Sequence, residues 1–172
     1  SDPGDMVSFL CIRAAASGGV SRFVSSLSVF EEIRRERPDL LAVLARGFRY
    51  HRFGEQGPDD DPITPHRIPV FSERDGLVSG RFVREYVEIA PDEDPSIVLT
   101  DTDHEAIRVL EETANSPGLA LDFTMAAGEA VVANNFTVFH ARTAFTDWSE
   151  PDCRRHLIRL WLRHQDRAFY NG

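Results

Sequence analysis

Short segments of alternating or continuous apolar residues recur along most of the chain, separated by glycine, proline, serine and asparagine. Two such segments, residues 6–12 and 21–25, are predicted strands on either side of a Ser17-Gly18-Gly19 turn. The last third is also β in character, with predicted strands at residues 119–125, 130–140 and 156–163. We therefore expect a mainly β fold, a sandwich or jelly roll, with helical insertions.

Helix signals interrupt the strands in the middle of the chain. The capping-box spacing, a hydroxyl residue followed three positions later by glutamate, occurs at Ser28 and at Thr102 and predicts two helix starts. Pro38 suits the first turn of another helix, which Gly47 would end. Between the helices, residues 48–53, 67–71 and 80–89 are predicted strands, and residues 54–65 a surface loop.

Composition limits the partners more than it limits the fold. A chain of 172 residues with 42% hydrophobic content can bury one sizeable core, so a single domain over residues 1–172 is expected. The 28 acidic and 19 basic residues give a net charge of -9, which disfavours nucleic acid and anionic membranes. A small anionic substrate stays open, because a local arginine cluster can override the overall sign.

Cysteine usage and the absence of long apolar runs bear on the compartment. Cys11 and Cys153 fit neither a disulfide scaffold nor a zinc site. No apolar run approaches the roughly 20 residues that a membrane helix needs. We therefore expect a soluble, cytoplasmic protein whose partner is a small molecule.

The residues with chemical potential lie near the C-terminus. Alternation along the strand that ends at His140 puts His140 and Arg142 on one face. In the last strand Arg155, Arg159 and Arg163 share one face in the same way. Taken alone, this is also the pattern of a solvated arginine face over an apolar core face, with a structural histidine nearby.

These residues together resemble the signature of a known family. Asn134-Asn135, residues 140–145 (HARTAF) and residues 154–162 (RRHLIRLWL) closely resemble the C-terminal part of the taurine dioxygenase-like, or clavaminate synthase-like, oxygenases, which depend on iron(II) and 2-oxoglutarate. Residues 17–21 resemble a glycine turn of the same family. The resemblance covers nearly the whole chain and implies a double-stranded β-helix, a form of jelly roll, incomplete at its N-terminus.

The resemblance implies roles for four residues. His140 matches the second histidine of the iron site, and iron(II) accepts such mixed nitrogen and oxygen ligand sets. Arg155 matches the arginine that holds the far carboxylate of 2-oxoglutarate, and Ser21 a hydroxyl residue that assists it. Arg159 resembles a position that contacts an anionic substrate group in some relatives. The implied activity is hydroxylation of a small, anionic organic substrate with release of succinate and carbon dioxide.

One part of the family's iron site has no match in this sequence. The resemblance calls for a His-x-Asp or His-x-Glu pair before the strand at residues 6–12, so we expect a fragment of a longer enzyme. His164-Gln165-Asp166 has this spacing but follows the arginine strand, which indicates a chance match. Two alternatives stay open: a jelly-roll binding or assembly module without a complete metal site, and a halogenase in which chloride replaces the carboxylate.

Overall fold

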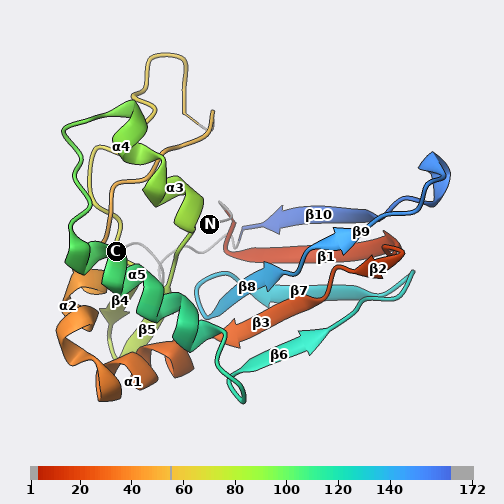
Figure 1. Cartoon of the computed structure of the whole chain (residues 1–172), viewed down its shortest axis with the longest axis horizontal. Coiled ribbons are helices and arrows are strands. Elements are labelled where there is room, and N and C mark those ends of the chain that lie inside the picture. The colour runs from red at the N-terminus through yellow and green to blue at the C-terminus, as the bar shows by residue number, and fades with distance from the viewer. Residues whose placement is uncertain (1–3, 55, 164–172) are drawn as a thin grey trace.

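The computed structural model describes residues 4–54 and 56–163, which form β-sheets on one side and a group of helices on the other (Figure 1). The strands are β1 (Met6–Arg13), β2 (Ser17–Gly18), β3 (Ser21–Ser25), β4 (Phe71–Arg74), β5 (Leu77–Gly80), β6 (Ala120–Phe123), β7 (Ala130–Asn134), β8 (Val138–Arg142), β9 (Phe145–Thr146) and β10 (His156–Leu162). The helices are α1 (Ser26–Glu36), α2 (Pro38–Arg46), α3 (Arg84–Glu88), α4 (Ala90–Glu93), α5 (Asp101–Ala114) and the short 3-10 helix η1 (Pro151–Cys153). The expected mainly β architecture with helical insertions is confirmed.

Two three-stranded antiparallel sheets carry most of the β structure. One has the strand order β10-β1-β7 and the other β6-β3-β8, and two small pairs, β4-β5 and β2-β9, accompany them. In the first sheet Phe9 of β1 lies opposite Arg159 of β10. In the second, Phe23 of β3 lies opposite His140 of β8. Strands from the two ends of the chain are therefore neighbours in both sheets.

The main hydrophobic core lies between the helices and the second sheet. Its largest fully buried side chains include Ile33 of α1, Leu44 of α2 and Ile107 of α5. Phe139 of β8 reaches this core from the sheet, with its ring centroid 5.9 Å from that of Phe71. Because side chains alternate along a strand, the next residue, His140, points to the opposite side. One strand thus joins the core to the space between the sheets.

Both helix starts that were predicted from capping boxes are displaced. Helix α1 is capped by Ser25, whose hydroxyl accepts a hydrogen bond from the Ser28 amide at 3.2 Å. Helix α5 is capped by Thr100 and Asp103, each of which bonds the other's backbone amide. Several hydroxyl residues follow one another at each start, so the spacing rule selected a later one; the helices themselves are present. Helix α2 begins at Pro38 and is followed by Gly47, as expected.

Two strand predictions in the middle of the chain are wrong, and two others have wrong bounds. Residues 48–53 make only isolated bridges, and residues 80–89 turn into α3, whose Arg84 and Glu88 pair one helical turn apart. The expected strand at 130–140 is two strands, because the Asn134 side chain accepts a hydrogen bond from the Phe136 amide at 2.8 Å and forms a turn. The expected strand at 67–71 begins only at Phe71, and it pairs with β5 in a hairpin.

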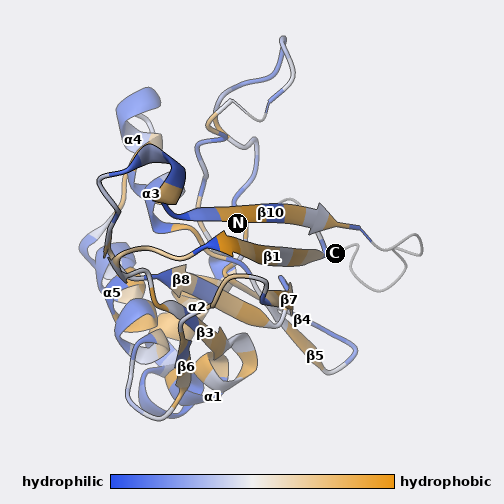
Figure 2. Ribbon diagram, turned by 90° about the vertical axis from the view of Figure 1, so that its right-hand side faces the viewer, coloured by the Kyte–Doolittle hydropathy of each residue, from blue (hydrophilic) through white to orange (hydrophobic). Residues whose placement is uncertain are grey.

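The two cysteines lie in different surroundings. Cys11 is a buried free thiol and Cys153 an exposed one. Among the residues that the structure describes, no helix combines the length and apolar character needed to cross a membrane. Hydrophobic stretches, orange in Figure 2, occur in β1, β5 and β10.

Candidate functional site

His140 lies between the two sheets, held by aromatic rings from both. The ring centroid of Phe9, in the β10-β1-β7 sheet, is 5.8 Å from that of His140. Phe23, the neighbour of His140 across the β3-β8 pair, has its centroid 5.9 Å away. The imidazole is partly buried, so the two rings restrict both its orientation and its contact with water.

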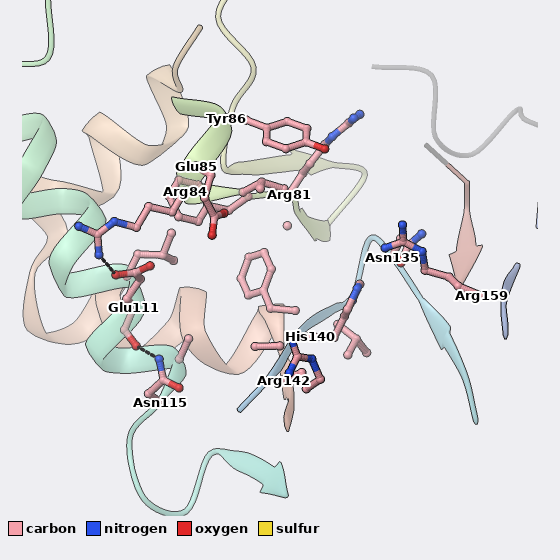
Figure 3. Close-up of a pocket in the computed structure, with 18 of the residues that line it drawn as sticks. Arg81, Arg84, Glu85, Tyr86, Glu111, Asn115, Asn135, His140, Arg142 and Arg159 are labelled. Carbon is pink, nitrogen blue, oxygen red and sulfur yellow. Dashed lines mark hydrogen bonds and ion pairs between the residues drawn. The ribbon is translucent and has the colours of Figure 1, made fainter. Parts of the chain in front are cut away.

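A cavity of about 530 Å³ opens beside His140; we call it the His140 pocket. One wall comes from β8 and β10, including His140, Arg142, Arg159 and Trp161. The facing wall comes from residues 80–86 and from α5 (Figure 3). A concave space of this size, with a few polar groups converging on it, is typical of small-molecule sites.

Arg159 enters the same pocket from β10. It is the cross-strand neighbour of Phe9, so its side chain leaves the sheet on the side on which Phe9 meets His140. Its central guanidinium carbon lies 4.9 Å from the ring centroid of Trp161, a cation–π contact. The predicted metal ligand and the predicted substrate arginine therefore line one cavity.

Arg155 lies just before β10 and is not part of the wall of the His140 pocket. Its backbone amide donates to Asp147 Oδ1 at 2.6 Å, and its central guanidinium carbon is 5.1 Å from the ring centroid of Phe145. Partial burial lowers the pKa of the Arg155 guanidinium, and the positive charge of Arg142 lowers it further. The group is thus a cation in surroundings that resist its charge, a condition that an anionic ligand relieves.

Ser21 lies on the inner side of β3, close to the turn beside Arg155. It pairs across the sheet with Arg142 of β8 and shares the face of Phe23, which contacts His140. Two residues earlier, Gly19 has φ +69°, and a Cβ atom there would come within 3.4 Å of Arg155 Nε. Gly19 therefore lies directly beside the guanidinium that the family resemblance assigns to the cosubstrate.

The donor set for a metal is incomplete within the described residues. Across residues 4–54 and 56–163, no group of three or more His, Cys, Asp or Glu side chains is placed to hold a metal ion. His140 can supply one nitrogen ligand, and its position at a cavity fits an ion that must also bind small molecules. His164-Gln165-Asp166 lies outside the described residues.

Sequence reasoning missed several residues that shape this region. Residues 80–86, which form one wall of the pocket, were assigned to a strand, and no pattern in them pointed to a cavity. Phe9 and Phe145 had a usable signal, since Phe9 shares the inner face of β1 with the buried Val7 and Cys11. Arg142 was placed on the His140 face but was given no function.

Comparisons with known proteins identify the family of this chain. The family model described as "Taurine catabolism dioxygenase TauD, TfdA family" matches residues 1–161. FR-33289 synthase of Streptomyces rubellomurinus is 26% identical over 169 residues, covering 94% of this chain and 48% of that protein. Taurine hydroxylase-like protein SAT17 of Stachybotrys chartarum is 28% identical over 164 residues, covering 93% and 40%. The chain therefore spans about half the length of the curated relatives it matches.

Solved structures of oxygenases share the fold. Asparagine oxygenase, in a complex with Fe(II), hydroxyasparagine and succinate, superposes with a TM-score of 0.66 at 20% identity, covering 93% of this chain and 46% of that one. The non-heme iron oxygenase OrfP, with iron and alpha-ketoglutaric acid, gives 0.62 at 13% identity, covering 94% and 46%. Because the family model matches residues 1–161 of the 172 in this chain, the chain belongs to the taurine catabolism dioxygenase TauD/TfdA family.

Proposed function

We propose that this chain is the later part of an iron(II)- and 2-oxoglutarate-dependent dioxygenase that hydroxylates a small, anionic organic substrate. The observation that supports it most is that His140 and Arg159 line one cavity while Arg155 lies at the neighbouring end of the sheets. Membership of the TauD/TfdA family supports the same activity. The two three-stranded sheets would be the facing halves of a jelly roll, completed by an upstream segment.

His140 is the proposed iron ligand contributed by this part of the protein. Neutral imidazole suits iron(II), and the Phe9 and Phe23 rings would fix its orientation before the metal binds. The other ligands would come from the upstream His-x-Asp or His-x-Glu pair that the family resemblance calls for. One histidine alone is too few for a stable site, so the metal would depend on both parts of the protein.

Arg155 and Ser21 are the proposed partners of the far carboxylate of 2-oxoglutarate. A guanidinium presents two parallel N–H groups to a carboxylate, which fixes the direction of the keto acid as well as its affinity. With both bound, iron and 2-oxoglutarate supply the oxidising chemistry, in which one oxygen atom of dioxygen enters succinate, the other enters the product, and carbon dioxide leaves. The residues of this chain orient the reactants and restrict water.

Arg159 is the proposed contact for the anionic group of the substrate, a carboxylate or sulfonate. Its guanidinium lies over Trp161 in the His140 pocket, which would place a bound anion on the cavity side of β10. The net charge of -9 makes nucleic acid and anionic membranes poor partners. The free thiols of Cys11 and Cys153 support a reducing compartment such as the cytoplasm.

The test uses the full-length protein, including the upstream segment. Anaerobic addition of iron(II) and then 2-oxoglutarate should give a visible charge-transfer band, and admission of air should give succinate. Arg155→Ala should lose 2-oxoglutarate binding but keep iron, while Arg154→Ala, an exposed neighbour, should behave as wild type. A protein that binds iron but neither binds nor consumes 2-oxoglutarate would refute the proposal and favour a binding or assembly module.

A further inference from the structure

Two guanidinium groups from different parts of the chain lie over one aromatic ring. Arg142 ends β8, and its central guanidinium carbon is 4.4 Å from the ring centroid of Phe145. The corresponding carbon of Arg155, which precedes β10, is 5.1 Å from the same centroid. The ring attracts each cation, but the two like charges repel each other. A third, negatively charged group beside them would remove that repulsion.

Within the part of the chain that the structure describes, the negative charge of Asp147 acts on Arg155, but from beyond ion-pair distance. There, the Arg142 and Arg155 guanidinium groups form no ion pair with any carboxylate. Arg142 Nη1 donates to the Thr143 carbonyl oxygen at 2.8 Å, a neutral acceptor. The Asp147 carboxylate accepts from the Arg155 backbone amide and not from its side chain. Nine of the other arginines that the structure describes do pair with acidic residues: Arg22, Arg34, Arg35, Arg37, Arg46, Arg52, Arg74, Arg84 and Arg108.

A glycine and a serine lie next to the pair. Gly19 has a positive φ, and a Cβ there would lie 3.4 Å from both Arg155 Nε and Phe145 Cβ. The adjoining Ser21 is the cross-strand neighbour of Arg142, so its hydroxyl lies on the face from which that guanidinium projects. This region thus combines two guanidinium groups, the Ser21 hydroxyl and Gly19, which has no side chain. This set of donors fits a single carboxylate.

We propose that Arg142 is a second cosubstrate arginine, which holds the far carboxylate of 2-oxoglutarate together with Arg155. The inference rests on the proposed function, because it adds a residue to the cosubstrate site that Arg155 defines there. Phe145 keeps the two guanidinium groups in position, and the carboxylate neutralises the charge they share. Since a keto acid without a far carboxylate cannot do so, the pair also selects 2-oxoglutarate over shorter monocarboxylic keto acids.

The experiment compares two ligands in the full-length protein with iron(II) bound and air excluded. The dissociation constants of 2-oxoglutarate and of 2-oxobutyrate, which lacks the far carboxylate, are measured by calorimetry for wild type and for Arg142→Met. We expect Arg142→Met to weaken 2-oxoglutarate binding roughly 10- to 100-fold, the usual effect of losing a charged hydrogen bond. The affinity for 2-oxobutyrate should stay within about twofold, since the lost contact is to a group that it does not have.

Matched variants separate this role from a structural one. Arg154→Met removes the same charge from an exposed neighbouring position and should change neither constant. Arg142→Lys, which keeps the charge but not the planar fork, should lie between Met and wild type, and it serves as the test if the Met variant does not fold. Equal changes for both ligands, or no change for either, would overturn the assignment of Arg142. If wild type does not bind 2-oxoglutarate at all, the proposed function itself fails, whereas dependence on Arg155 without dependence on Arg142 defeats only this inference.

Discussion

Phe9 of β1 and His140 of β8 meet edge to face across the space between the two sheets, with ring centroids 5.8 Å apart. They join the β10-β1-β7 sheet to the face of β8 that turns away from the helical core. The imidazole therefore has a fixed neighbour on a different sheet, in addition to Phe23 on its own sheet. A side chain whose orientation is already fixed loses less conformational entropy when it binds a metal ion.

Replacing His140 should remove iron binding. We expect His140→Ala in the full-length protein to lose high-affinity iron(II) while remaining folded, because the imidazole is only partly buried. His104→Ala, on the exposed side of α5, is the matched control and should bind iron as wild type does. Metal content after anaerobic loading and gel filtration measures this. Retention of stoichiometric iron by the His140 variant would place the metal elsewhere.

Replacing Phe9 should affect the metal site indirectly. Phe9→Ala removes the edge-to-face contact, so it should reduce stability by about 1–3 kcal/mol, less than a fully buried phenylalanine, and should weaken iron(II) binding several-fold. Phe9→Leu keeps most of the volume and should recover stability more than iron affinity. Urea unfolding and metal titration on the same samples give the two quantities. If both variants lose stability and affinity in the same proportion, Phe9 does not orient the imidazole.

Replacing Arg159 should impair the response to substrate but not the binding of 2-oxoglutarate, which depends on Arg155. Arg159→Met should leave the dissociation constant of 2-oxoglutarate within about twofold of wild type, because its guanidinium lies over Trp161 and not over Phe145. In a panel of small carboxylates and sulfonates, compounds that accelerate succinate formation by wild type should lose that effect in the variant. An Arg159 variant that loses 2-oxoglutarate instead would show that the two roles are interchanged.

The start of α5 should depend on Thr100 and Asp103. The Asp103 side chain is buried, accepts from the Thr100 amide at 2.9 Å and from its hydroxyl at 2.8 Å, and pairs with Arg46. Asp103→Ala should therefore reduce the free energy of unfolding by about 1–3 kcal/mol, and Thr100→Ala by about 1 kcal/mol. Thr102→Ala, which the spacing rule would select as the cap, should cost less than either. Urea denaturation of the three variants decides among these positions.

The pairing of Arg22 with Asp122 across β3 and β6 should make stability depend on acid. Hydrogen bonds from the Arg22 guanidinium, at 2.6 and 2.5 Å, hold the pKa of Asp122 below its ordinary value. A carboxyl group with a lowered pKa adds stability above its unfolded pKa and loses it as the pH falls through the folded value. Asp122→Asn should thus lower the melting temperature near neutral pH and converge with wild type in acid. A constant difference at all pH values would mean that the pair is not responsible.

The sequence predicted the strands that carry the chemistry better than the connections between them. β1 and β3 were recognised as short strands on either side of a glycine turn. Alternation along β8 placed His140 with Arg142 on one face, and alternation along the last strand placed Arg155 with Arg159. Residues 80–89 failed because their apolar positions suit a strand as well as a short helix. The Arg84–Glu88 pair and the burial of Val87 and Ala90 against the core decide in favour of the helix.

The sequence predicted which residues belong to the site but not how they are arranged in space. Family resemblance selected His140, Arg155, Arg159 and Ser21, but the distances between them depend on how β8, β3 and β10 pair across long stretches of chain. The wall at residues 80–86 is formed by a segment with no chemical signature of its own. Its contribution arises from tertiary packing, which no local pattern encodes.

The bulge in β1 between Cys11 and Arg13 has a further consequence for β10. Arg159 and Arg155 leave one continuous piece of backbone four positions apart, on either side of the place where the pairing with β1 shifts. A slip of one residue would turn both guanidinium groups outward at once, whereas a change confined to the bulge would move Arg155 alone. The position of Arg159 thus follows from the regular register of the sheet, and that of Arg155 from the backbone beyond the irregularity.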